Sequence, residues 1–290
     1  MSPTAPTAPT GGIGTGGGSG TSRTGPRAAY AWWGLCATGL LLILLGPELA
    51  PHGPTATPGP PYRPPAAGAP LGTDHLGRDV LSMVLHGGRP LLLTGLLAVG
   101  IGSVFGASAG LLTALAGARS RLPRMLLMRP LDALAAVPPV LLVLLILTAL
   151  PGRVGLITAI ALAGTPLSAR VAYAAAEQVV GRAHVEAAIA RGESRCRLLG
   201  REVLPLVAGA LLADAGIRFT GAVYLVAAAG FLGVGGSSDA DWGRLIVEAL
   251  PGASLQPLAL LAPVLAVALV AVTVNLAADS AGHRSRKVLA

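Results

Sequence analysis

A serine in the pattern GxSxG is the first residue of the chain whose type and spacing suggest covalent chemistry: GASAG, at Gly106–Gly110. In serine hydrolases this pattern places the serine on a sharp strand-to-helix turn, close to a histidine that removes its proton. Here Ser108 lies in the middle of a long apolar run. The histidines all fall outside such runs or at their edges: His52, His75, His86, His184 and His283. Helix packing is therefore the favoured interpretation, because Gly102, Gly106 and Gly110 would share one helix face, and an intramembrane serine protease is the enzyme alternative.

The sequence also lacks the residues that would bind a nucleotide or a metal. A P-loop needs a lysine on the phosphates, whereas the only lysine is Lys287. GIGTGG, from Gly12, formally matches a dinucleotide fingerprint, but no strand precedes it in a Ser-, Thr-, Pro- and Gly-rich segment. Cys36 and Cys196 have no metal-ligand spacing. We expect this chain to bind no cofactor and no metal, so that any ATP must be bound by another protein.

Asp214 and Arg218 are the charged residues that stand inside an otherwise apolar run. They are four positions apart with the acid first, which is the favourable order for an ion pair on a helix. The structural interpretation is a pair that neutralises itself near the inner end of a long helix. The functional interpretation is that the pair, or Arg218 alone, lines or gates a path through the membrane. Ionisable pairs near the midplane also occur in secondary transporters, so a transporter or channel that acts alone is a second alternative.

The composition indicates a membrane protein. The 290 residues are 53% hydrophobic and only 12% charged, against roughly 25% charged in a soluble domain. Glycine is abundant and aromatic residues are scarce, as in helices that pack through small side chains in lipid. The formal charge is +8, but the basic residues are scattered between apolar runs and lack interleaved aromatics. Nucleic acid is therefore excluded as a partner, and the lipid bilayer is the expected environment.

Apolar runs of membrane-spanning length, about 20 residues, predict an all-α integral membrane protein with six transmembrane helices. The first run could be a cleaved signal peptide, but the runs that follow it favour an uncleaved anchor. The predicted spans are Ala28–Pro47, Pro90–Ala118, Ala133–Gly152, Val154–Ala169 with an extension past Arg170, a run from Pro205 to about Leu232, and Ala253–Ala278.

The arginines orient these spans. Most of them fall in the segments that lie inside if the N-terminus is inside, so the positive-inside rule predicts an N-in, C-in topology. The expected division is a disordered cytoplasmic tail (1–27), a first transmembrane helix (28–47), an extracytoplasmic linker and interfacial segment (48–89), a transmembrane domain (90–279) and a cytoplasmic tail (280–290). Within the outer segment, Pro51–Pro70 predicts a semi-rigid extended linker. Thr73 or Asp74 is expected to cap a short helix along the outer surface.

The polar stretch from His184 to Pro205 lies on the predicted cytoplasmic side. Glu186, Ala187 and Ala188 are followed by Gly192, and LP stands at positions 204–205. This stretch resembles the EAA signature of ATP-binding-cassette importer permeases. In that family it forms a short cytoplasmic coupling helix, here between the fourth and fifth spans, that sits in a groove of a separate ATPase. Small alanines suit such a contact, and Gly192 permits a turn.

Three further segments resemble the dipeptide/oligopeptide/nickel subfamily of these permeases. LGTDHLGRDVL (71–81) is similar to its GTDxxGRD segment, MRPLDALAAVPP (128–139) to its R-x-x-D…P pattern, and FLGVGGSSDADWG (231–243) to its FLGLG…WG element. They occur in the order of the family, and the resemblance covers about Leu71–Asp279. Arg191 departs from it, because that position is usually aliphatic.

The resemblance implies the function and the partners. The chain would be one permease of a bacterial plasma membrane importer, paired with a second homologous permease, with two ATP-binding cassette subunits that use ATP and Mg²⁺, and with an extracytoplasmic solute-binding protein. Glu186, Ala187, Ala188, Arg191 and Gly192 would contact an ATPase. Peptides are the first expected cargo, with nickel or another small solute second.

The resemblance also points to residues outside the coupling segment. Relatives often carry a polar residue near the position of Val226 on the path, where this chain is apolar, so its cargo preference is expected to differ. The outer residues have two open interpretations: they shape the outer gate or the surface that receives the binding protein, or they are purely structural. They are Asp74, Arg78, Asp79 and Trp242.

Overall fold

The computed structural model describes residues 38–288, except 40, 42, 118–121 and 235–239. The predicted tail 1–27 and most of the predicted first span lie outside the described residues. The described chain is almost entirely helical, as predicted, and its only bridges are the isolated pairs Ala66–Ala69 and Thr73–Asp79. The helices are α2 (Gly46–Leu49), α3 (Val80–Gly117), α4 (Leu122–Ala135), α5 (Pro139–Ala149), α6 (Arg153–Val180), α7 (Ala183–Ala190), α8 (Arg195–Arg197), the π-helix η1 (Leu198–Val203), α9 (Leu204–Phe231), α10 (Trp242–Ala249), the 3₁₀-helix η2 (Leu250–Gly252) and α11 (Pro257–Val288).

Within the described residues, four stretches are long and apolar enough to cross a membrane: Val80–Ala116, Arg153–Val180, Leu198–Phe231 and Pro257–Val274. The first begins ten positions before the predicted start at Pro90. Pro90 does not stop the helix but lies within it. The charged residue Arg89 is tolerated near the helix end because its side chain is half exposed and pairs with Glu48.

The predicted span Ala133–Gly152 differs most from the structure. It is divided between α4 and α5, which meet at an angle of 93°. Pro138 is extended at φ −57° and ψ 130°, and Pro139 opens α5. A proline disfavours helical geometry in the residue before it and donates no backbone hydrogen bond. The two consecutive prolines therefore end α4 and start a new helix in another direction.

The glycine face of α3 packs against α6, as the spacing predicted. A Cβ atom at Gly102, Gly106 or Gly110 would meet the backbone oxygen of Ala161, Thr165 or Ala169, respectively. The two backbones therefore approach more closely than any side chain would allow, which is how small residues hold helices together in lipid. GASAG lies wholly within α3 and not on a strand-to-helix turn, so its geometry is that of helix packing.

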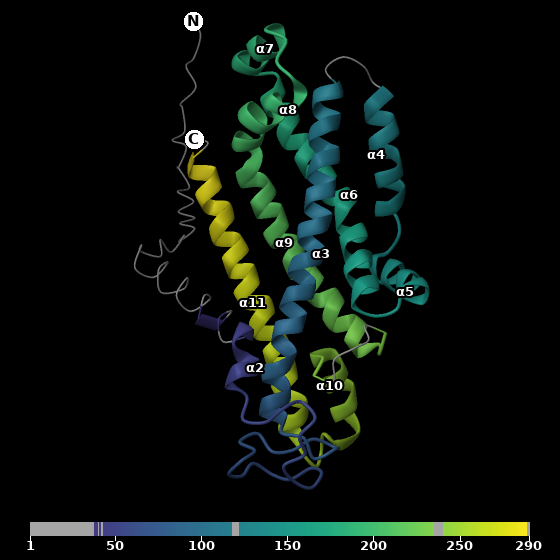
Figure 1. Ribbon diagram of the computed structural model, residues 1–290, viewed down its shortest axis with the longest axis vertical. Helices are drawn as coiled ribbons and strands as arrows, with labels where there is room; N and C mark the ends of the chain where they lie inside the picture. Colours follow the sequence, from purple (N-terminus) through teal and green to yellow (C-terminus); the bar gives the residue numbers. More distant parts are fainter. Residues whose placement is uncertain (1–37, 40, 42, 118–121, 235–239, 289–290) are drawn as a thin grey trace, which may run out of the picture.

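Figure 1 shows the helices running between two ends of the molecule. At one end lie α7, the C-terminal end of α3, the N-terminal end of α4 and the C-terminal end of α11. At the other end lie the segment that precedes α3 and the helix α10. The helix α7 and the C-terminal end of α11, which the arginine distribution placed inside, are thus at one end, and the segment before α3 and α10, which it placed outside, are at the other. The N-in, C-in orientation itself stays a prediction.

Candidate functional site

The helix α7 sits at the end of the molecule that was predicted to face the cytoplasm (Figure 1). Val185 and Ala188 on one face of α7 are fully buried. They join an apolar cluster to which α3, α6, η1 and α9 also contribute: Leu111, Ala114, Ala172, Ala176, Val179, Leu198, Val203 and Val207. Glu186 and Ala187 lie on the exposed face. The helix is therefore anchored on one side to the ends of three spans and is open on the other.

The two alanines of the motif, Ala187 and Ala188, differ in burial, although the sequence pattern predicted the same role for both. Ala187 is exposed, whereas Ala188 has no exposed surface. A partner protein can contact only the first of them directly. Ala188 has the size that lets α7 lie close to its own domain, whereas a docking contact by Ala187 stays a prediction.

Gly192 ends α7 in a left-handed turn. Its φ is +76°, a conformation that side chains with a Cβ disfavour. Its N–H donates to the Ile189 carbonyl at 3.0 Å, and the N–H of Glu193 donates to the Ala188 carbonyl at 3.2 Å. These two bonds form a Schellman cap, which satisfies the last carbonyl groups of the helix. Arg191 precedes the turn and pairs with Glu193 at 2.9 Å, with most of its side chain in solvent.

Asp214 and Arg218 form an ion pair on α9. Nε and Nη2 of Arg218 donate to the two carboxylate oxygens of Asp214 at 2.8 and 2.6 Å. Ser168 on α6 donates a further hydrogen bond to Asp214 at 2.9 Å. The carboxylate is buried, and its three hydrogen bonds fix the orientation of the guanidinium group. The pair predicted from spacing is therefore present, and Ser168 is a third member that the sequence did not reveal.

A pocket of about 210 Å³ lies between α3, α5, α6 and α9. Arg218 lines it together with Ser103, Gly164 and Leu225. Asp214 does not line it and lies behind Arg218. Val226, the position that the resemblance placed on the path, is 4% exposed and belongs to the apolar core of the bundle. Within this chain Val226 therefore packs in the core, whereas its neighbour Leu225 faces the pocket.

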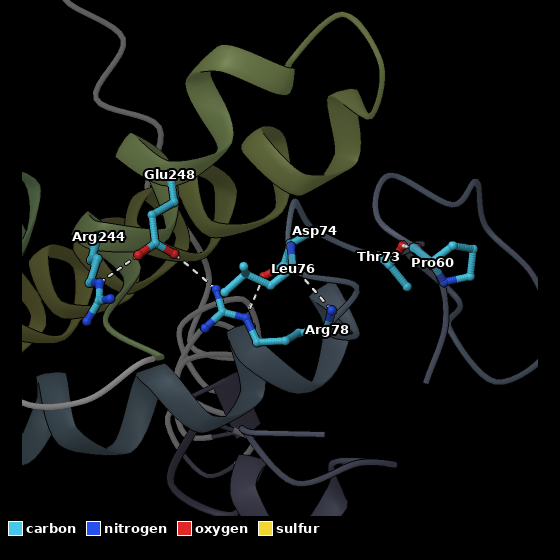
Figure 2. A network of polar contacts seen from close by, with 7 residues as sticks. All are labelled: Pro60, Thr73, Asp74, Leu76, Arg78, Arg244 and Glu248. Carbon is cyan, nitrogen blue, oxygen red and sulfur yellow. Dashed lines mark hydrogen bonds and ion pairs between the residues drawn. The ribbon is translucent and has the colours of Figure 1, made fainter. Parts of the chain in front are cut away.

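The outer segment forms a compact cap over the end of the bundle and is not the extended linker that its prolines suggested. Asp74 accepts hydrogen bonds from the backbone of Leu76 and Arg78 and, at 2.6 Å, from Nε of Arg78. Arg78 also reaches Glu248 on α10, which Arg244 contacts from its other side. Figure 2 shows this chain of ion pairs. Thr73, beside it, donates to the carbonyl of Pro60 at 2.7 Å.

The residue that caps a helix here is Asp79, at the start of the span α3. The predicted caps, Thr73 and Asp74, do not cap a helix. The carboxylate of Asp79 accepts from the backbone of Leu81 and Ser82 at 3.2 Å and from the Ser82 hydroxyl at 2.5 Å. His52 approaches the same carboxylate at 3.4 Å. Trp242 is 2% exposed, and its indole donates to the Val84 carbonyl at 2.8 Å.

Asp74, Arg78, Asp79 and Trp242 are all buried in the chain itself. Their side chains are directed to internal partners, which favours the structural interpretation of these outer residues. Sequence reasoning missed two members of this cap, Glu248 and Gln256. Gln256 donates to the carbonyls of Arg63 and Leu71. The only sequence signal for Glu248 was its spacing of four from Arg244; Gln256 had none.

Residues 102–287 match the family of binding-protein-dependent transport system inner membrane components. The di/tripeptide transport system permease protein DppC of Pseudomonas aeruginosa is 37% identical over 62% of this chain, and the match spans 59% of that relative's own length. The probable D,D-dipeptide transport system permease protein DdpC of Escherichia coli is 31% identical over 72% of this chain and 70% of its own.

A longer match extends into the outer cap. The probable peptide ABC transporter permease protein y4tQ of Sinorhizobium fredii is 32% identical over 85% of this chain and 84% of its own length. Among solved structures, a chain of the MetNI methionine ABC transporter, in an inward-facing conformation, has a TM-score of 0.53 at 18% identity. That likeness covers 69% of this chain and 96% of the other, and it concerns the fold. The chain therefore belongs to the family of binding-protein-dependent transport system inner membrane components, as its motifs predicted, and is a permease subunit of an ABC transporter.

Proposed function

We propose that this chain forms one half of the translocation path of an importer for short peptides or a related small solute. The similarity to permeases named for dipeptides and other peptides supports this cargo class. A second homologous permease would supply the other half of the path. An extracytoplasmic binding protein would deliver the solute to the end that carries the cap and α10.

Two separate ATP-binding cassette subunits would provide the energy, and they would bind ATP and Mg²⁺. The observation that carries this proposal is the construction of α7, which is exposed at Glu186 and Ala187 and anchored at Val185 and Ala188. A helix held in this way moves as one body with the span ends that share its apolar cluster. Closure of the ATPases on α7 would therefore be transmitted to α6 and α9. Because a ligand shifts an equilibrium only through unequal contacts with its two states, the closed ATPases would have to contact α7 more favourably in one state of the helix bundle than in the other.

Co-purification with two variants of Gly192 tests the proposal. The tagged chain is extracted gently from its native membrane, and its partners are identified by mass spectrometry. We expect an ATPase and a second permease with the wild-type chain. Gly192→Val, whose β-branched side chain opposes a positive φ, should lose the ATPase and keep the second permease. Gly192→Asn is the matched control, because asparagine tolerates this conformation. A wild-type chain that purifies alone would refute the proposal and favour a transporter that acts by itself.

A further inference from the structure

The pocket between α3, α5, α6 and α9 lies close to the middle of three spans. Its lining residues come from the central parts of α3, α6 and α9, among them Gly102, Gly164 and Gly221. Its volume of about 210 Å³ is many times the roughly 15 Å³ that one water molecule requires. It therefore has room for a terminal group of a small solute.

Two residues with polar side chains line this mostly apolar space. Arg218 lines the pocket, and its side chain is 18% exposed. Ser103 lines it from α3, and its Oγ is buried without a hydrogen-bond partner among the described residues. A buried hydroxyl group without a partner costs free energy. Because Ser103 lines the pocket, rotation about its single χ angle would turn this hydroxyl group toward a ligand.

The ion pair on α9 sets the direction in which Arg218 can bind. Asp214 takes Nε and Nη2, and in the described part of the chain no residue accepts from Nη1. Asp214 is itself held by Ser168 and lies outside the pocket lining. The pair is neutral as a whole, but only its cationic member lines the pocket, and the carboxylate of Asp214 is already satisfied. A guanidinium donates and never accepts, so the complementary ligand group is an acceptor, and an anionic one binds most strongly.

On the basis of the proposed function, we infer that this pocket is a subsite for the carboxylate of the transported solute, with Nη1 of Arg218 and Oγ of Ser103 as its two donors. Gly164 and Gly221 line the pocket and leave it open, because a Cβ at either position would occupy space without a close neighbour. The terminal carboxylate of a short peptide has the required charge and size. An ammonium group does not fit, because it would meet a donor.

Thiol labelling tests the chemistry of the pocket without knowledge of the cargo. Ser103→Cys is placed in a chain that also carries Cys36→Ala and Cys196→Ser, within native membrane vesicles that contain the partner subunits. The probes are 2-sulfonatoethyl methanethiosulfonate, an anion, and 2-(trimethylammonium)ethyl methanethiosulfonate, a cation. We expect the anion to react faster by about tenfold, the size of one hydrogen bond to a charged group, relative to the ratio measured on a free thiol. Asp214→Asn with Arg218→Gln removes both charges together, so that no carboxylate is left unpaired, and should abolish the preference.

A second test of the subsite compares the uptake of dialanine with that of its C-terminal amide. Ser103→Ala and the double variant should lower dialanine uptake by about tenfold and uptake of the amide by a smaller factor, because the amide oxygen is an uncharged acceptor. An unreactive thiol, or a preference that survives in the double variant, would overturn the subsite. If wild-type vesicles take up no dialanine, the proposed peptide cargo fails, but the labelling ratio still decides whether the pocket selects anions.

Discussion

The guanidinium group of Arg78 and the carboxylate of Glu248 form an ion pair at 3.0 Å, although 170 positions separate them in the sequence. Arg78 is 6% exposed and is also bonded to Asp74. It therefore joins the loop before α3 to α10, and it neutralises two carboxylates that would otherwise face each other. The outer cap depends on this one cation more than on any exposed pair.

Replacement of Arg78 by alanine should destabilise the cap strongly. Removing one partner of a buried pair leaves an uncompensated charge, which costs about 3–5 kcal/mol. Arg244→Ala is the matched control, because Arg244 contacts the same Glu248 from a side chain that is 47% exposed, and such pairs contribute about 0–1 kcal/mol. Thermal unfolding in detergent measures both variants. Equal losses for the two arginines would contradict the central role of Arg78.

Glycines on different faces of α3 should respond in opposite directions to the same substitution. Gly106→Ala should lower the unfolding temperature, because its Cβ would meet the Thr165 carbonyl and the side chain of Ser168 on α6. Gly100 has open space around it, so Gly100→Ala should be neutral or stabilising by up to about 1 kcal/mol, the helix preference of alanine. The comparison is made on the purified chain in one detergent. A tolerated alanine at position 106 would refute close packing along this face.

Asp241 should make the stability of the outer end depend on pH. Burial raises the pKa of its carboxyl above the ordinary 3.8, and the backbone N–H groups and the charges of Arg244 and Arg153 reverse this only in part. Because the folded pKa lies above the unfolded one, the contribution of Asp241 favours folding at low pH and declines as pH rises through the raised pKa.

Asp241→Asn tests this dependence, since asparagine can still accept the N-cap bonds from Gly243 and Arg244. Its unfolding temperature should rise relative to wild type between about pH 4 and pH 7. Asp241→Ala, which loses the cap, should be less stable by about 1 kcal/mol. If asparagine and alanine lower stability equally, the burial cost of the charge is not significant.

Substitutions of the two alanines of α7 should impair the protein for different reasons. Ala187→Asp should abolish ATPase binding and transport without a change in the stability of the chain, since Ala187 is exposed. Ala188→Leu should lower the unfolding temperature of the isolated chain, because the larger side chain must enter a filled cluster, at a typical cost of about 1–3 kcal/mol. Transport assays and thermal unfolding separate the two effects. Wild-type transport by Ala187→Asp would remove this residue from the coupling contact.

Much of the fold follows from local patterns in the sequence. Apolar length predicted the helical membrane class and the approximate positions of the described spans. The glycines at intervals of four predicted the face of α3 that packs on α6, and Gly192 predicted the turn that ends α7. These features are local because each depends on residues within a few turns of one helix. The motifs around Glu186 and Asp74 likewise predicted the family, because they too are short stretches of contiguous sequence.

Tertiary structure alone decided which residues meet. The bend at Pro138 and the Asp79 cap at the start of α3 are still local, because two prolines and one carboxylate act on adjacent residues, although hydropathy did not reveal them. Ala187 and Ala188 have the same side chain, and only the packing of α7 exposes one and buries the other. Composition and spacing describe neighbours along the chain. The pairing of Arg78 with Glu248, and of Ser103 with the pocket of Arg218, depends on distances that only the packed helices define.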